Sequence, residues 1–264
     1  MLEKITQQVI EVAKEAGAFI RKERETFGAD KIEYKGLNDL VSYVDKTAEQ
    51  IIVKGLQTIL PEAGFITEEQ TNTIVSERYN WIIDPLDGTT NFIHGLPVFS
   101  VSIALKEHEE LVMGVVYEVN LDECFYAWKD SAAYLNGKEI KVSAASKISD
   151  SLLATGFPYY DFSKQPQYIA LFTHLMKSCH GLRRLGSAAV DLAYTACGRF
   201  DAYYEYNLNP WDVAAGIVIV RQAGGHVVNY SGGNEILNSR ELLATNGKLT
   251  EEMLGVIEEY FKIS

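Results

Sequence analysis

Cysteine is scarce in this sequence, with three residues in 264, and none of them stands in a Cys-x-x-Cys pair. Neither a disulfide framework nor a zinc site is therefore expected. Long apolar runs are also missing, since no stretch approaches the roughly 18 residues that a membrane span requires. The charged first segment has no signal-peptide pattern. These absences predict a soluble, cytoplasmic protein that is not attached to a membrane.

Positive charge is scarce as well. The chain has 24 Lys and Arg residues against 36 Asp and Glu residues, which gives a formal net charge of −12. Proteins that bind nucleic acid neutralise phosphates with basic side chains, so direct nucleic-acid binding is not expected. The same negative charge would repel an anionic substrate unless bound divalent cations supplied positive charge locally. Apolar residues make up 47% of the chain, which is enough for a sizeable core.

Hydrophobic spacing predicts helices at the start of the chain, short strands after them, and a mixture of helices and strands in the second half. Apolar residues three and four positions apart indicate amphipathic helices over 5–20 and 48–60, the second ended by Pro61. Asn136-Gly137 is typical of a hairpin turn. The other predicted elements are helices at 168–176, 187–196, 210–220 and from Thr250, an antiparallel meander of 98–106, 111–117 and 123–128, and strands at 64–66, 81–83, 201–206, 227–228 and 242–244.

Helices and strands are interspersed without strict βαβ alternation, which predicts a mixed α+β, layered fold. The polar stretch 35–45 between the first two helices is too short to link two domains. No internal repeat or change in composition marks a domain boundary. We therefore predict a single domain over residues 1–264, with two sub-regions at roughly 1–145 and 146–264.

An acidic run follows the apolar strand at 81–83. Because Pro85 has no N–H to donate, we expect the strand to end there and the chain to turn. The turn would present the carboxylates of Asp84 and Asp87 and the carbonyl of Leu86 at the edge of the sheet. Such oxygen ligands suit Mg²⁺, which prefers a few carboxylates together with water and substrate oxygens.

The end of this run suits a phosphate. Gly88 permits a tight turn, and Thr89, Thr90 and Asn91 are suited to capping a helix. Free N–H groups at a helix start bind phosphate oxygens. The segment 84–90, with sequence DPLDGTT, therefore predicts metal-assisted phosphoryl transfer rather than two ordinary surface turns.

Two further acidic residues stand at comparable boundaries. Glu68 follows the strand at 64–66, and Asp212 lies in the first turn of the helix that Pro210 opens. Taken singly, an acidic residue after a strand is usually solvated, and one in a first turn usually complements the helix dipole. Both gain a functional interpretation only from the central run.

Three ordered motifs resemble the signatures of the inositol monophosphatase family. Residues 81–92, WIIDPLDGTTNF, resemble the first signature, and residues 211–216, WDVAAG, with AGG at 223–225, resemble the second. Residues 65–69, FITEE, match the upstream acidic element, with threonine where glycine is frequent. The segments LGSAA at 185–189 and DAYYE at 201–205 also match, so the resemblance spans most of the chain.

The resemblance implies a layered αβαβα sandwich of the inositol monophosphatase and fructose-1,6-bisphosphatase type, with two or three Mg²⁺ ions per subunit. One ion would be held by Glu68, Asp84 and the Leu86 carbonyl. A second would be held by Asp84, Asp87 and Asp212, and a third, weaker ion would lie near Glu68. Bound cation would lower the pKa of the attacking water.

Catalytic roles are implied by the resemblance for Glu68, Thr89 and Asp45. Thr89 would orient or deprotonate the attacking water, backed by Asp45. An alternative for Asp45 is the N-cap of the second helix, and both roles can coexist. Lys35 corresponds to a basic residue near the metal loop of the family. The pair Arg183-Arg184 resembles the bacterial members and would reach a second phosphate or a protein partner, or remain solvated surface.

The activity that the resemblance implies is hydrolysis of myo-inositol monophosphate to inositol and phosphate by a lithium-sensitive, homodimeric enzyme. Its substrate is therefore a small phosphorylated polyol. The implied substrate contacts are Leu86, Asp87, Gly88, Thr89, Gly186, Ser187, Ala188, Glu205 and Asp212.

Several alternative functions stay open. Relatives within the superfamily cleave fructose 1,6-bisphosphate, 3′-phosphoadenosine 5′-phosphate or histidinol phosphate, and the last two commonly have lysine where this chain has Thr90, which favours a polyol monophosphate. An aspartyl-phosphate mechanism needs two aspartates separated by one residue, whereas Asp84 and Asp87 are separated by two. Ser187 does not lie in the nucleophile elbow of a serine hydrolase. The non-enzyme alternative is a regulatory protein that contacts the transcription machinery, as some bacterial relatives do.

Overall fold

The computed structural model describes residues 1–28, 32–36, 39–158 and 161–261, with the backbone alone for 32–36 and 39–41. The side chain of Lys35, which the resemblance places near the metal loop, therefore lies outside the described residues. Within these ranges, none of the helices combines the length and the apolar character that a membrane span needs. All three cysteines are free thiols, in line with the prediction that no disulfide framework exists.

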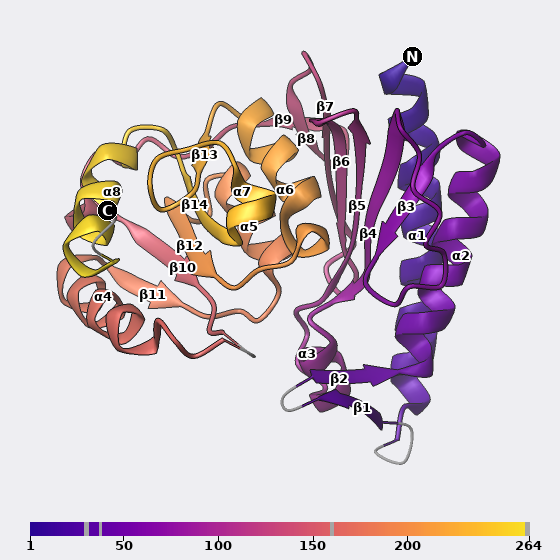
Figure 1. The fold of residues 1–264 in the computed structure, drawn as a ribbon, viewed down its shortest axis with the longest axis horizontal. Helices are drawn as coiled ribbons and strands as arrows, with labels where there is room; N and C mark the ends of the chain where they lie inside the picture. The colour runs from indigo at the N-terminus through magenta and orange to yellow at the C-terminus, as the bar shows by residue number, and fades with distance from the viewer. Residues whose placement is uncertain (29–31, 37–38, 159–160, 262–264) are drawn as a thin grey trace.

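Helices and sheets alternate in layers across the molecule (Figure 1), which confirms the predicted layered α+β fold. One outer layer is formed by α1 (Leu2–Thr26) and α2 (Tyr43–Ile59), which pack on a seven-stranded sheet. Apolar residues of both helices at the predicted spacing, among them Val9, Ile52 and Leu56, are fully buried against that sheet.

The middle and far layers come from the second half of the chain. Between the two sheets lie α5 (Ala188–Ala196) and α6 (Pro210–Gln222), whose buried faces join a core shared with the first sheet. The far face of the second sheet is covered by α4 (Gln165–Ser178) and α8 (Thr250–Phe261). All four helices lie where hydrophobic spacing predicted them.

The first sheet has the order β3-β4-β5-β6-β7-β8-β9. Only the β3–β4 pair of this sheet is parallel, and the antiparallel pairs include the predicted meander, which is β5, β6 and β7. Asn136 and Gly137 turn the last hairpin with positive φ angles of 47° and 81°. The strands are β3 (Gly64–Thr67), β4 (Tyr79–Asp87), β5 (Ser100–Glu107), β6 (Glu110–Glu118), β7 (Glu123–Trp128), β8 (Ala133–Leu135) and β9 (Lys138–Ile140).

The second sheet has the order β11-β10-β12-β14-β13 and mixes parallel and antiparallel pairs. Sequence patterns predicted β12, β13 and β14, but not β10 and β11. The strands are β10 (Leu152–Thr155), β11 (Gly181–Arg183), β12 (Ala202–Tyr206), β13 (His226–Val228) and β14 (Glu241–Thr245). The chain also contains the short helices α3 (Thr89–His94) and α7 (Ile236–Ser239) and the 3₁₀ turn η2 (Ile148–Asp150).

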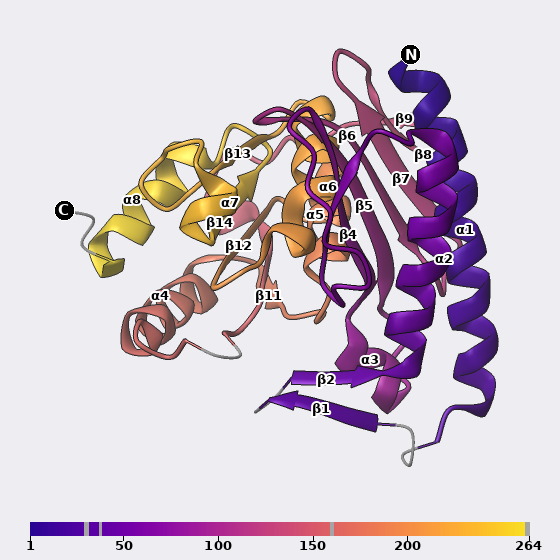
Figure 2. The ribbon, with the colours of Figure 1, turned by 45° about the vertical axis from the view of Figure 1, so that its right-hand side comes forward.

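The polar stretch between the first two helices is not wholly irregular. It contains the antiparallel pair β1 (Ile32–Gly36) and β2 (Asp39–Ser42), which lies beside α3 and the start of α2 (Figure 2). Helix α2 begins at Tyr43, five residues before its apolar spacing becomes recognisable. Ser42 is its N-cap and accepts a hydrogen bond from the Val44 N–H, so a polar cap rather than a buried face starts this helix.

Strand β4 continues past Pro85, which corrects the prediction that the strand ends there. Its pairing with β5 loses register between Asp84 and Asp87 and resumes with Asp87 opposite Ser100. On its other side, the pairing with β3 extends only to Ile83. Pro85, which has no N–H, therefore lies in an irregular stretch where neither of these pairings needs a backbone donor at this position.

Candidate active site

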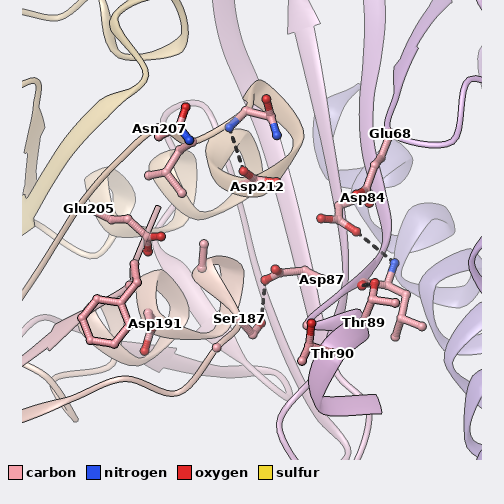
Figure 3. Close-up of a pocket in the computed structure, with 18 of the residues that line it drawn as sticks. Glu68, Asp84, Asp87, Thr89, Thr90, Ser187, Asp191, Glu205, Asn207 and Asp212 are labelled. Carbon is pink, nitrogen blue, oxygen red and sulfur yellow. Dashed lines mark hydrogen bonds between the residues drawn. The ribbon is translucent and has the colours of Figure 1, made fainter. Parts of the chain in front are cut away.

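A cavity of about 120 Å³ opens between the two sheets. Its walls are the end of β4, the start of α3, the first turns of α5 and α6, and the end of β12 (Figure 3). The cavity brings together every predicted site residue except Asp45, namely Glu68, Asp84, Leu86, Asp87, Gly88, Thr89, Gly186, Ser187, Ala188, Glu205 and Asp212.

The two aspartates of β4 are almost fully buried, at 3% exposure for Asp84 and 8% for Asp87. Asp84 accepts a hydrogen bond of 3.0 Å from the Leu86 N–H, within the irregular stretch of the strand. Asp87 accepts two bonds from the start of α5: the Ser187 hydroxyl donates at 2.5 Å and the Ala189 N–H at 2.7 Å. Asp87 thus ties the first sheet to the helix layer between the sheets.

Asp212 and Glu68 enter the cavity from two other elements. Asp212 is the third residue of α6, and its carboxylate accepts the Asn209 N–H at 2.7 Å in a capping box. Glu68 directly follows β3, and its N–H donates to the Ile83 carbonyl at 3.3 Å, beside Asp84. Figure 3 shows Asp84, Asp87 and Asp212 around one common space, with Glu68 at its margin.

Asp45 does not line the cavity but is hydrogen-bonded to Thr89, which does. The Thr89 hydroxyl is 2.8 Å from Asp45 Oδ1 and 2.9 Å from the Leu86 carbonyl, and either can accept its proton. Asp45 Oδ2 accepts the Ser42 N–H at 2.8 Å. Asp45 is therefore the third residue of α2, and the alternative that it is the N-cap is wrong. Thr89 is likewise no cap of α3, because Gly88, with φ 95°, occupies the N-cap position.

Burial dominates the electrostatics of these acids. It raises the pKa of Asp84 well above its ordinary value, and the charges of the neighbouring carboxylates at Glu68, Asp87 and Asp212 raise it further. Burial raises the pKa of Asp87 to about 6 and that of Asp212 to about 7. So many buried carboxylates in one place resist ionisation unless positive charge enters the cavity.

This donor set fits a divalent metal ion by its chemistry. As placed, no three His, Cys, Asp or Glu side chains among the described residues converge closely enough to hold an ion. Asp84 and Asp212 each accept a backbone N–H at one carboxylate oxygen, which leaves the other oxygen for a cation. Oxygen donors without histidine or cysteine favour Mg²⁺ over zinc.

The end of the cavity away from β4 is also acidic. Glu205 in β12 accepts the Tyr203 hydroxyl at 2.5 Å, and burial raises its pKa to about 8. Its carboxylate packs so closely on Gly156 that a Cβ there would overlap it. Burial also raises the pKa of Asp191 well above its ordinary value. Within the described part of the chain, both Asp191 oxygens and the Asn207 amide nitrogen are buried without a hydrogen-bond partner.

Several lining residues were missed by sequence reasoning. Asp191 stands one helical turn after Ser187, and Asn207 two positions after Glu205, so helix and strand periodicity contained a signal for both. Arg184 was noted without a definite role, and its guanidinium lies 5.7 Å from the ring centroid of Phe157 at the cavity. The other lining residues outside the predicted set are Thr90, Gly156, Leu208 and Asn209.

Comparisons with known proteins match this fold and this site. The model of the inositol monophosphatase family matches residues 1–261. Nus factor SuhB of Escherichia coli is 40% identical over 247 residues, which cover 93% of this chain and 92% of that protein. Inositol-1-monophosphatase of Mesorhizobium japonicum is 35% identical over 253 residues, or 95% of each chain. The structure of inositol monophosphatase from Anabaena (Nostoc) superposes with a TM-score of 0.88 at 35% identity, covering 98% of this chain and 97% of that one.

The chain belongs to the inositol monophosphatase family. This family is of the phosphatase type, acts on small phosphorylated substrates and is generally metal-dependent.

Proposed function

We propose that this protein is a Mg²⁺-dependent phosphomonoesterase that hydrolyses myo-inositol monophosphate to inositol and phosphate. The observation that carries the proposal is the convergence of Glu68, Asp84, Asp87 and Asp212 on one cavity. Their raised pKa values reflect buried negative charge that a divalent cation would neutralise. A relative of 35% identity named Inositol-1-monophosphatase supports the choice of substrate.

Two sets of ligands would hold the ions. Glu68, Asp84 and the Leu86 carbonyl would bind the first Mg²⁺, and Asp84, Asp87 and Asp212 the second, with a third ion near Glu68. Bound Mg²⁺ would supply positive charge to the phosphate oxygens and lower the pKa of the attacking water. Asp84 is the residue common to both sets, so it is the most informative position for a substitution.

Thr89 and Asp45 would orient the water. When the Thr89 hydroxyl donates its proton to Asp45, the lone pairs of the Thr89 oxygen face the cavity and can accept a hydrogen bond from water. Asp45 is 1% exposed and held by Ser42, so it keeps Thr89 in this orientation. A proton taken from water by Thr89 would pass to Asp45. The backbone N–H groups of Gly88 and Thr89 would hold the phosphate.

The far end of the cavity would receive the polyol ring, with Gly186, Ser187 and Ala188 lining it and Glu205 as the main polar contact. Burial raises the pKa of Glu205 to about 8 in the metal-free protein, which favours its protonated form at neutral pH. A neutral carboxyl both donates and accepts hydrogen bonds, which matches a hydroxyl group. The buried polar atoms of Asp191 and Asn207 add further acceptors and a donor at this end.

The test is a phosphate-release panel on inositol 1-phosphate, fructose 1,6-bisphosphate, 3′-phosphoadenosine 5′-phosphate and histidinol phosphate, with Mg²⁺, with a chelator and with Li⁺. We expect inositol 1-phosphate to be the best substrate, with activity lost in chelator and inhibited by Li⁺. Asp84→Asn should lose activity, whereas Asp130→Asn, at an exposed turn with φ 65°, should not. Full activity of Asp84→Asn, or full activity in chelator, contradicts the metal-dependent mechanism.

A second candidate function is contact with the transcription machinery. Its support is the name Nus factor SuhB, which the Escherichia coli relative of 40% identity carries. Asp84→Asn separates the two functions, because it removes a cavity carboxylate that is 3% exposed and leaves the surface unchanged. A regulatory function that survives in this variant is independent of catalysis. The predicted homodimer is tested by sedimentation of the intact chain.

A further inference from the structure

Glu49 is a buried carboxylate of α2 that has no contact with the cavity. Its side chain has 0% exposure, yet it accepts three hydrogen bonds from the segment that follows β3. The Glu69 N–H donates to Oε2 at 2.8 Å. The Thr71 N–H and hydroxyl donate to Oε1 at 2.8 Å and 2.7 Å. Both carboxylate oxygens of Glu49 therefore accept hydrogen bonds from this loop.

The loop is bent to fit that anion. Gln70, between the two donating residues, has φ 54°, a left-handed conformation that residues other than glycine seldom adopt. A left-handed residue between two amides turns both N–H groups toward the same point and makes an anion-binding concavity. Because Gln70 and Thr71 are exposed and lie outside any helix or strand, the Glu49 carboxylate is the main described contact that maintains the bend.

The residue positioned by this bend is Glu68. Its own N–H is anchored to the Ile83 carbonyl of β4, and the next amide along the chain, that of Glu69, is anchored to Glu49. The backbone of Glu68 is thus fixed from both sides. Without the second anchor, the loop could rotate Glu68 away from Asp84.

The same helix holds the other side of the site. Asp45 stands one turn before Glu49, on the same face of α2, and binds the Thr89 hydroxyl. We propose that Glu49 is a positioning residue that fixes Glu68 for metal binding, so that α2 sets both the metal ligand and the water-orienting threonine. This inference rests on the proposed function.

The direct test is Glu49→Gln, studied as the intact chain without substrate. An amide has one acceptor oxygen for three donors, and its NH₂ group would face an N–H. We expect the affinity for Mn²⁺, titrated by electron paramagnetic resonance or calorimetry, to fall by about 10–100-fold, the usual effect of removing an outer-shell partner. Hydrogen exchange at the Glu69 and Thr71 amides should accelerate. Raising Mg²⁺ should restore most of kcat.

Two controls separate positioning from general damage. Glu62→Gln, at an exposed glutamate just beyond α2, should bind Mn²⁺ and exchange amides as the unaltered protein does. Asp45→Asn should lower kcat but leave Mn²⁺ affinity within a few-fold. If Glu49→Gln does not fold, Thr71→Val is the deciding test. It removes only the Thr71 hydroxyl that donates to the Glu49 carboxylate, so it should weaken Mn²⁺ binding more mildly.

The outcomes are distinguishable. Unchanged Mn²⁺ affinity in folded Glu49→Gln, or in Thr71→Val if the first variant fails to fold, overturns the positioning role. A loss of kcat that excess Mg²⁺ does not restore, with Mn²⁺ affinity intact, also overturns it. If the unaltered protein itself fails to bind Mn²⁺, the result contradicts the proposed function rather than the positioning role of Glu49.

Discussion

Glu205→Gln should stabilise the metal-free protein at neutral pH. The side chain is 8% exposed and lies against Gly156, where a glutamine of the same shape fits and still accepts the Tyr203 hydroxyl. Burial raises the pKa of Glu205 from 4.5 to about 8, so at pH 7 the folded protein holds a proton that the unfolded chain has released. That proton uptake opposes folding, and glutamine removes it.

The magnitude follows from the shift. For a group whose pKa is raised on folding, stability is complete below the unfolded pKa, here 4.5, and falls as pH rises to the folded pKa of about 8. Each pH unit in this window costs about 1.4 kcal/mol. At pH 7 the unaltered protein should therefore be about 3 kcal/mol less stable than Glu205→Gln, which corresponds to a Tm lower by roughly 5–10 °C.

The assay is thermal or urea unfolding in chelator at several values between pH 4.5 and pH 8. Chelator is needed because a cation near Asp87 and Asp212 would weaken the charges that help to raise the Glu205 pKa. The gap between the two proteins should be small near pH 4.5 and grow steadily to pH 8. Exposed Glu62→Gln should show no such gap. A stability difference that does not change with pH, or that has the opposite sign at pH 7, refutes this account.

Two further substitutions test the walls of the cavity. Asp45→Asn should reduce kcat by about 10²–10⁴-fold, because the amide cannot take a proton from Thr89. It should also lower the free energy of unfolding by about 0.5–2 kcal/mol, because the capping box is lost. Steady-state kinetics measures the first effect and urea unfolding the second, and an unchanged kcat contradicts the proton transfer from Thr89 to Asp45. Gly156→Ala should raise KM for inositol 1-phosphate and destabilise the protein by about 1–3 kcal/mol, because the new methyl group displaces the Glu205 carboxylate. The comparison substrate is p-nitrophenyl phosphate, which has no polyol ring. An equal loss of kcat/KM on both substrates counts against a specific effect at Glu205.

Local patterns predicted most helices and strands of this fold. Helix α6 was predicted to begin at Pro210, and it does begin there. Strands β10 and β11, of four and three residues, were missed, although β13 is as short as β11 and was predicted. The prediction at Pro85 also failed. The rule that proline ends a central strand assumes partners on both sides, whereas the pairing of β4 with β3 ends at Ile83, before Pro85.

The candidate site likewise combines residues that local patterns predicted with residues that they did not. Asp84 and Asp87 were identified from their neighbours in the chain, because a strand followed by an acidic turn is a local pattern. Asp212 was placed in the first turn of its helix in the same way, but gained a functional interpretation only from that acidic run. The predictions for Glu205 and for residues 186–188 came from family resemblance alone. Nothing local distinguishes Glu205, since a glutamate among tyrosines in a strand is more often an ordinary strand residue.

The sequence by itself determined which acidic residues stand at the ends of helices and strands, because capping, turn chemistry and periodicity act over a few neighbouring positions. Only the tertiary structure decided that these ends meet. Asp87 reaches Ser187 across 100 positions of the chain, and Glu49 reaches Thr71 across 22. Such contacts depend on how the sheets and helices stack, and that stacking also buries the carboxylates and raises their pKa values.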